Sequence, residues 1–100
     1  MLPTLTTPRL ILRPRTKADL DDCLLMDRDP LVTQFIPGPW SEPDDHRAFV
    51  LHNMTQAYPE GLGYWSVVGQ DAPQDFLGWI LLVPYQAVGD EVEIGWRFRR

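Results

Sequence analysis

Strand-like patterns of apolar residues occur in four separate parts of the chain. The predicted strands are residues 9–13, 63–69, 76–85 and 92–98. In the first of them, Leu10 and Leu12 share one face, as the two-residue period of a strand requires. Short polar turns at 70–75 and 86–90 separate the last three strands. Connections of this kind indicate antiparallel neighbours.

Between the first two strands, the apolar positions change to helical spacing. Thr16 fits the N-cap of a helix, and Asp19 stands three residues later, as in a capping box. The helix is expected to run to about Asp27 and to end before Pro30. Residues 31–36 predict one further short helical turn.

A second helix is expected after the loop Pro37-Gly38-Pro39, with Ser41 as its N-cap and Pro59 as its limit. Its apolar face is predicted to contain His46, Phe49, Val50, Asn53, Met54 and Ala57. The order of elements is therefore β-α-α-β-β-β. We predict a single α+β domain over residues 1–100, with two helices against a mostly antiparallel sheet.

Composition narrows the class of protein. Apolar residues make up 44% of the chain and charged residues 23%, which favours a folded domain over a disordered one. The net charge of −5 argues against a nucleic-acid partner, because a basic surface is needed to bind phosphates. No apolar run is long enough to span a membrane. We therefore expect a cytoplasmic protein with no membrane partner.

The single cysteine and the two histidines argue against disulfide and metal chemistry. Cys23 is the only cysteine, which excludes an internal disulfide, and its apolar neighbours predict a buried structural thiol. His46 and His52 are six positions apart and do not share a helix face. We therefore expect no metal site.

Glu91 and Glu93 share one face of the last predicted strand with Gly95 and Arg97. A carboxylate pair in a cleft can do acid–base work, because repulsion and burial raise one of the two pKa values. The same pair on an open strand face would only be solvated. The spacing alone leaves both interpretations open.

Two further features indicate binding. Phe35, Ile36 and Trp40 surround the Pro37-Gly38-Pro39 loop, which either borders a pocket or packs on the core. The chain ends in a cationic group of Arg97, Arg99 and Arg100, which would favour a phosphate-bearing ligand.

Four segments, taken in order, resemble the N-terminal half of a GNAT-type N-acetyltransferase. They are Arg9-Leu10-Ile11-Leu12-Arg13-Pro14, Asp29-Pro30-Leu31-Val32-Thr33, Phe76-Leu77-Gly78-Trp79-Ile80 and Glu93-Ile94-Gly95-Trp96. The likeness is to the subgroup that acetylates ribosomal-protein N-termini. It covers essentially the whole chain and implies the GNAT acyltransferase fold.

The resemblance implies transfer of an acetyl group from acetyl-CoA to a primary amine, either a protein N-terminus or a small-molecule amine. Glu93 occupies the position of a general base, and Arg97, Phe98 and Arg99 occupy the strand end that contacts acetyl-CoA. We expect the loop with Phe35 and Trp40 to border the acceptor pocket.

The family's pyrophosphate-binding loop would follow Arg100, so the resemblance implies an N-terminal half that is inactive alone. The alternative is a non-catalytic interaction module, which would use a Trp-rich sheet and an exposed strand edge to pair with another chain. The expected partners are acetyl-CoA and an amine acceptor, and a homodimer is left open.

Overall fold

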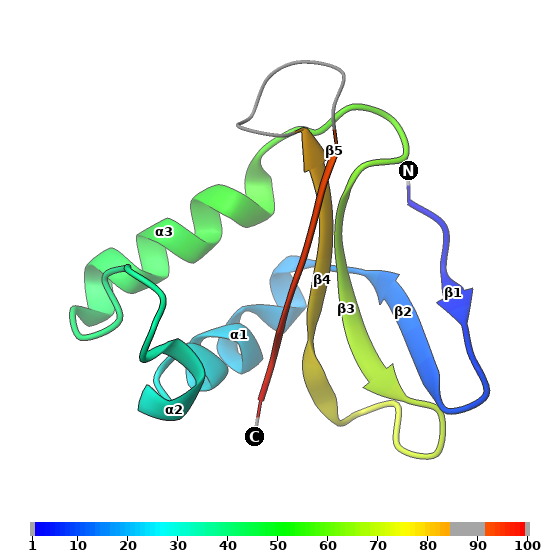
Figure 1. Cartoon of the computed structure of the whole chain (residues 1–100), viewed down its shortest axis with the longest axis horizontal. Helices are drawn as coiled ribbons and strands as arrows, with labels where there is room; N and C mark the ends of the chain where they lie inside the picture. The colour runs from blue at the N-terminus through cyan, green and yellow to red at the C-terminus, as the bar shows by residue number, and fades with distance from the viewer. Residues whose placement is uncertain (1, 85–91, 100) are drawn as a thin grey trace.

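The computed structural model describes residues 2–84 and 92–99, and after one additional N-terminal strand its elements follow the predicted order (Figure 1). The strands are β1 (Leu5–Thr6), β2 (Leu10–Pro14), β3 (Gly63–Gly69), β4 (Phe76–Pro84) and β5 (Val92–Phe98). The helices are a 3₁₀ turn, η1 (Lys17–Asp19), and the α-helices α1 (Leu20–Asp27), α2 (Pro30–Thr33) and α3 (Pro43–Thr55).

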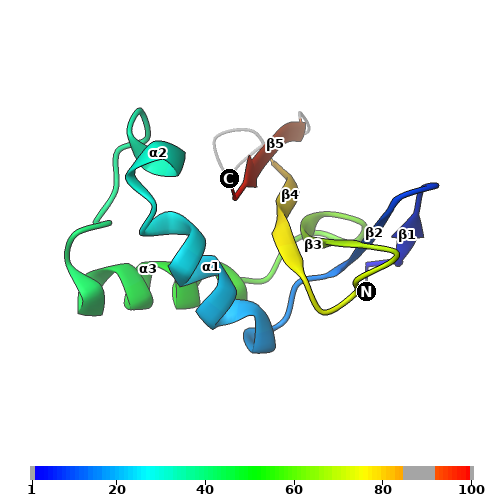
Figure 2. The same cartoon turned by 90° about the horizontal axis from the view of Figure 1, so that it is seen from below.

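The sheet has the order β1-β2-β3-β4-β5, and each strand is antiparallel to its neighbour. Figure 2 shows the three α-helices on one side of the sheet. Helix α1 packs against α3 and contacts β4. The predicted α+β class and the mostly antiparallel sheet are therefore confirmed.

Strand β1 was not predicted, because a strand of two residues has no period to detect. It is held by a tight turn, in which the Thr7 backbone N–H donates to the Leu10 carbonyl oxygen at 2.9 Å. The Leu10 N–H in turn donates to Thr7 Oγ1 at 3.0 Å. This turn pairs Leu5 with Leu12 and Thr6 with Ile11.

The predicted N-cap of the first helical region is confirmed: Thr16 caps it and forms a capping box with Asp19. The region begins as the 3₁₀ turn, and α1 itself starts only at Leu20. The predicted start of the second helix needs correction. The N-cap of α3 is Glu42 rather than Ser41, because Pro43 takes the first helical position. Helix α3 ends at Thr55, so Ala57 lies beyond it. The predicted turn at 86–90 lies outside the described residues.

The core lies between α1, α3 and the middle of the sheet. Its buried members are Leu20, Cys23, Leu24, Met26, Val50, Phe76 and Trp79. Cys23 is a buried thiol, as predicted, and burial raises its pKa to about 11. The thiol is therefore neutral at physiological pH.

Gly78 lets β5 approach β4 closely. It has φ of 157°, a backbone region that L side chains rarely adopt. A Cβ atom at this position would clash with the backbone carbonyl of Arg97 and with Phe98. Gly78 therefore fixes where the Arg97 segment of β5 lies.

The alternation predicted for the last strand is present in β5. Arg97 is turned towards the helices, where it contacts α1. The opposite face presents the β5 apolar row, which consists of Val92, Ile94, Trp96 and Phe98. All four side chains are exposed, Trp96 to 66% and Ile94 to 62%.

Candidate functional site

A cavity of about 180 Å³ lies between the helices and the sheet, and we call it the helix–sheet cavity. It is lined by Arg15, Cys23, Asp27, Trp40, Phe49, Val50, Asn53, Tyr64, Trp79, Leu81 and Arg97. Its walls are aromatic: Trp40 stacks on Phe49 at 5.9 Å between ring centroids, and Tyr64 meets Trp79 edge-on at 5.2 Å. Such a cavity suits a small, partly apolar ligand.

Asp27 connects three elements at one side of this cavity. Arg97 of β5 donates from Nη1 to Asp27 Oδ1 at 2.8 Å. His46 of α3 lies 3.1 Å from the other oxygen through its Nε2. Asp27 and His46 are both buried, and a buried carboxylate is stable only when it is paired in this way. The Asp27 cluster therefore ties β5 to α1 and α3.

Arg97 is further held by aromatic rings. Its guanidinium carbon lies 5.0 Å from the Trp79 ring centroid and 5.1 Å from that of Trp40. Cation–π contacts of this length are attractive, most of all where water is excluded. The Arg97 side chain is therefore part of the cavity wall and has its partners within the fold.

A second buried carboxylate, Asp19, orders the junction of β2 and α1. Arg13 binds it through both terminal nitrogens, at 2.7 and 2.8 Å. The Thr16 N–H donates to it at 3.0 Å and the Ser66 hydroxyl at 2.8 Å. Burial by itself would raise the pKa of Asp19, but these hydrogen bonds outweigh burial and hold that pKa below its ordinary value.

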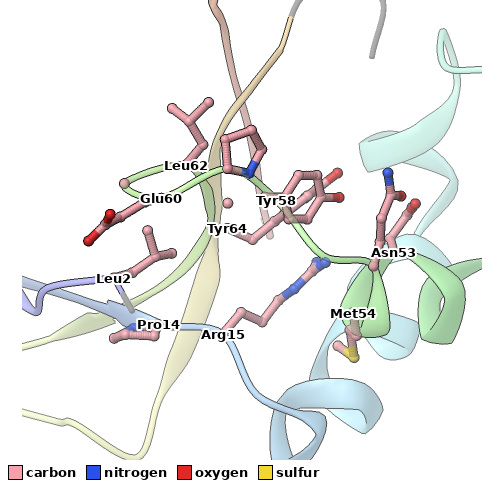
Figure 3. Close-up of a pocket in the computed structure, with 13 residues that line it drawn as sticks. Leu2, Pro14, Arg15, Asn53, Met54, Tyr58, Glu60, Leu62 and Tyr64 are labelled. Atoms are coloured by element: carbon pink, nitrogen blue, oxygen red, sulfur yellow. The ribbon is translucent and has the colours of Figure 1, made fainter. Parts of the chain in front are cut away.

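A second cavity, of about 240 Å³, lies next to the first and is called the loop cavity here (Figure 3). Residues 58–64 form much of its wall, with Leu2, Pro14, Arg15, Asn53, Met54 and Gln56. Arg15, Asn53 and Tyr64 line both cavities and so form their junction. Burial raises the pKa of Tyr64 to about 12, so its hydroxyl stays protonated at neutral pH.

The two residues predicted to border the acceptor pocket, Phe35 and Trp40, have different surroundings in the structure. Trp40 lines the helix–sheet cavity, and its indole N–H donates to the Ile36 carbonyl oxygen at 2.7 Å, which fixes the ring. Phe35 is 89% exposed and is not among the residues that line this cavity.

Glu93 is exposed and lines a different cavity, of about 440 Å³, beside the end of α3. It pairs with Val83 on β4, whereas Arg97 pairs with Trp79, so Glu93 lies further along the same strand face. The structure therefore does not bring Glu93 into the helix–sheet cavity. Its predicted partner Glu91 lies outside the described residues.

The three residues expected to contact acetyl-CoA have different surroundings. The Arg97 side chain is engaged by Asp27, and Phe98 belongs to the β5 apolar row. Arg99 is exposed, and its backbone N–H donates to the Leu77 carbonyl oxygen at 2.9 Å. Among the described strands, β5 pairs only with β4, which leaves its outer backbone edge open. Arg100 lies outside the described residues.

Two residues at the centre of this site, Asp27 and Arg15, were not predicted from the sequence, and only Asp27 had a signal in it. Leu20, Cys23, Leu24 and Asp27 follow the spacing of one helix face, so an acidic residue stood on the apolar stripe. Arg15 follows the first predicted strand and gave no comparable signal.

Within residues 2–84 and 92–99, no group of three or more His, Cys, Asp or Glu side chains could hold a metal ion. Of the helices in this part of the chain, none has the length and apolar character needed to cross a membrane.

Residues 9–100 match the family described as the acetyltransferase (GNAT) domain. The chain therefore belongs to the GNAT acetyltransferases, a family whose co-substrate is acetyl-CoA. No curated protein matches the chain.

Solved structures of the same class share the fold. A GNAT-family acetyltransferase from Bacillus anthracis is 24% identical with a TM-score of 0.70, and it covers 97% of this chain and 54% of its own. An acetyltransferase from Agrobacterium tumefaciens str. C58 is also 24% identical, with a TM-score of 0.69, covering 98% and 56%. The chain thus spans little more than half the length of either structure.

Proposed function

We propose that this protein transfers an acetyl group from acetyl-CoA to a primary amine, and that the helix–sheet cavity receives the acceptor. The family match over residues 9–100 carries the proposal. Support for the acceptor position comes from the aromatic walls of the cavity and from its contact with β5 through Arg97. The acceptor is a protein N-terminus, as in the ribosomal-protein subgroup, or a small-molecule amine.

The chemistry requires a base, because an ammonium group must lose its proton before nitrogen can attack the thioester. We assign this role to Glu93, acting directly or through water. Its exposed carboxylate is accessible to water, and it lies on the same strand face as Arg97. Glu93 lines its own cavity and not the helix–sheet cavity, which favours the route through water.

Acetyl-CoA is proposed to bind along the end of β5, at Arg97, Phe98 and Arg99. The open outer edge of β5 supports contacts through the backbone of these residues. A backbone N–H at this edge could also stabilise the oxyanion that develops as the amine attacks. The Arg97 side chain would keep its partner Asp27 and contribute by fixing the strand.

The proposal is tested by measuring CoA release from acetyl-CoA with a panel of peptides and small amines. The protein is used at the full length that its gene encodes. Release that depends on the amine is expected. Acetyl-CoA binding without transfer to any amine would contradict the proposal.

We propose that the 100 residues alone are inactive and bind acetyl-CoA weakly, because strand-end contacts would have to hold it without a phosphate cradle. Calorimetric titration of the 100-residue chain is the test. Micromolar affinity, about −8 kcal/mol, would show that the acetyl-CoA site is misplaced.

The exposed β5 apolar row favours a second candidate, a non-catalytic module that pairs with another chain or with a second copy of itself. Exposed apolar patches and open strand edges are typical of interaction surfaces. A protein that associates through β5 but transfers no acetyl group would support this candidate over the enzyme. For either function we place the protein in the cytoplasm and expect no nucleic-acid partner.

A further inference from the structure

Arg15 places a guanidinium group at the junction of the helix–sheet cavity and the loop cavity. The residue directly follows β2, and its backbone N–H donates to the Tyr64 carbonyl oxygen at 3.1 Å. The guanidinium carbon lies 3.9 Å from the Tyr64 ring centroid and 6.0 Å from that of Trp79. Figure 3 shows the side chain reaching below the Tyr58 and Tyr64 rings towards the end of α3.

This guanidinium has no carboxylate partner in the part of the chain that the structure describes. Arg13 is paired with Asp19 and Arg97 with Asp27, whereas Arg15 forms no salt bridge to a described residue. Its Nη2 atom is buried and lacks a hydrogen-bond partner among the described residues. Arg15 as a whole is half-buried, but a buried guanidinium nitrogen without a hydrogen-bond partner is costly, and stacking on Tyr64 offsets only part of that cost.

The charges around the junction favour an anion. In the helix–sheet cavity, Asp27 already accepts from Arg97, which leaves Arg15 as the uncompensated charge. Cys23 adds no negative charge there, because its thiol stays protonated at neutral pH. In the loop cavity the acidic residue is Glu60, which is exposed and points away from Arg15 (Figure 3).

We propose that Arg15 binds a carboxylate group of the ligand at this junction. A carboxylate matches the planar fork of donors on a guanidinium, and its single charge equals that of one arginine. Asn53 lines both cavities and can donate from its side-chain amide to the same group. If the protein has the proposed function, on which this assignment rests, its acceptors are small amines that also carry a carboxylate.

The first experiment measures binding without any enzymatic reaction. Propionate is titrated into the protein, with propionamide as its neutral match, and the NMR signals of the Asn53 amide and the Trp79 indole are followed. Propionate should shift both signals and propionamide should not. Arg15→Gln should weaken propionate binding about tenfold or more, because hydrogen bonds to charged groups are among the stronger ones.

Arg9→Gln is the matched control, since it removes the same charge from an exposed position one residue before β2. It should leave propionate binding unchanged. Dispersed amide spectra show whether each variant is folded. If Arg15→Gln does not fold, Arg15→Lys retains the charge but loses the fork, and it should weaken propionate binding by a smaller factor. Equal binding of propionate and propionamide, no effect of either Arg15 variant, or a preference for inorganic phosphate would overturn the carboxylate site.

A second experiment separates this inference from the proposed function. Acetyl transfer to 3-aminopropionate is compared with transfer to propylamine. The carboxylated amine should have the lower KM, and Arg15→Gln should abolish that difference while kcat changes less. Equal KM values would overturn the inference and leave acetyl transfer intact. Propionate binding at Arg15 without transfer to any amine would overturn the enzyme and the acceptor role, while the carboxylate site would stand.

Discussion

Single residues decide the chemistry of this molecule mainly through buried charge. Asp19 and Asp27 lie on the first helical segment, each paired with an arginine from the sheet, Arg13 or Arg97. Removing one member of a buried pair leaves the other uncompensated, which is far more costly than losing an exposed pair. The pairs therefore set both the stability of the fold and the position of Arg97 in the cavity wall.

Asp19 should make the fold sensitive to acid. Its pKa in the folded protein is below its ordinary value, so its contribution to stability is present above the unfolded pKa and is lost as pH falls through the folded one. Asp19→Asn should lower the free energy of unfolding by about 3 kcal/mol at pH 7, and by progressively less as the pH falls below about 4, the ordinary pKa of an aspartate. Urea unfolding of both proteins over a series of pH values from neutral to acid measures this difference. Asp21→Asn, at an exposed position on α1, should change little.

Glu93 is predicted to act on the chemical step. Glu93→Gln in the complete protein should lower kcat by about 10²–10⁴-fold, the usual contribution of a general base. A base works only when deprotonated, so the fall in rate at low pH should flatten in the variant, while acetyl-CoA affinity stays nearly unchanged. Steady-state kinetics across pH provide the measurement. Glu91→Gln is the control. Equal and small effects of both changes would show that these carboxylates are surface charges and that neither acts as the base.

Trp40 is predicted to contribute to acceptor binding. Trp40→Ala removes one aromatic wall of the helix–sheet cavity, so it should weaken acceptor binding about tenfold while acetyl-CoA binding changes less. Calorimetry with each ligand separates the two effects. Phe35→Ala alters the exposed part of the same loop and should have the smaller effect. A collapse of the thermal midpoint with both affinities normal would show that the Trp40 side of the loop is only core packing.

At the scale of the elements, the close pairing of β4 with β5 depends on a glycine. Gly78 has a positive φ and lies against the Arg97 carbonyl, so the β4–β5 pairing depends on the missing side chain. Gly78→Ala should lower the free energy of unfolding by about 2 kcal/mol or more, because backbone strain adds to the clash. Chemical denaturation of Gly78→Ala and of a control variant measures the two free energies of unfolding. Gly69→Ala is the control, since a Cβ there would meet its nearest neighbour only at 4.0 Å. Similar losses for both would show that β5 can shift to make room.

The fold as a whole leaves the β5 apolar row uncovered on the face opposite the helices. Because burial of apolar area drives association, we expect the 100-residue chain to self-associate. Trp96→Lys should shift the molecule towards monomer in sedimentation velocity experiments. Leu25→Lys changes an exposed leucine on α1, outside the row, and should leave the distribution unchanged. Monomeric behaviour of the unmodified chain at high concentration would contradict this expectation.

Local sequence determined the order of elements. Prolines, glycines and polar turns bound each segment, and β3 spans Gly63–Gly69, the range that its pattern predicts. The periods of helix and strand are local properties, so neighbouring residues suffice to reveal them. The same periods indicated the apolar face of β5 and the buried Cys23. They also carried the resemblance that the family match confirmed at the level of the GNAT domain.

The tertiary structure alone decided which polar residues meet. Asp27 pairs with His46 from 19 positions away and with Arg97 from 70 positions away, and no local pattern contains such a pairing. It also brought Trp40 but not Phe35 to the helix–sheet cavity, and it set Glu93 beside a different one. Burial is a property of the packed molecule. The charge of Arg15, left without a described carboxylate partner between Tyr64 and Trp79, became visible only once the helices had packed on the sheet.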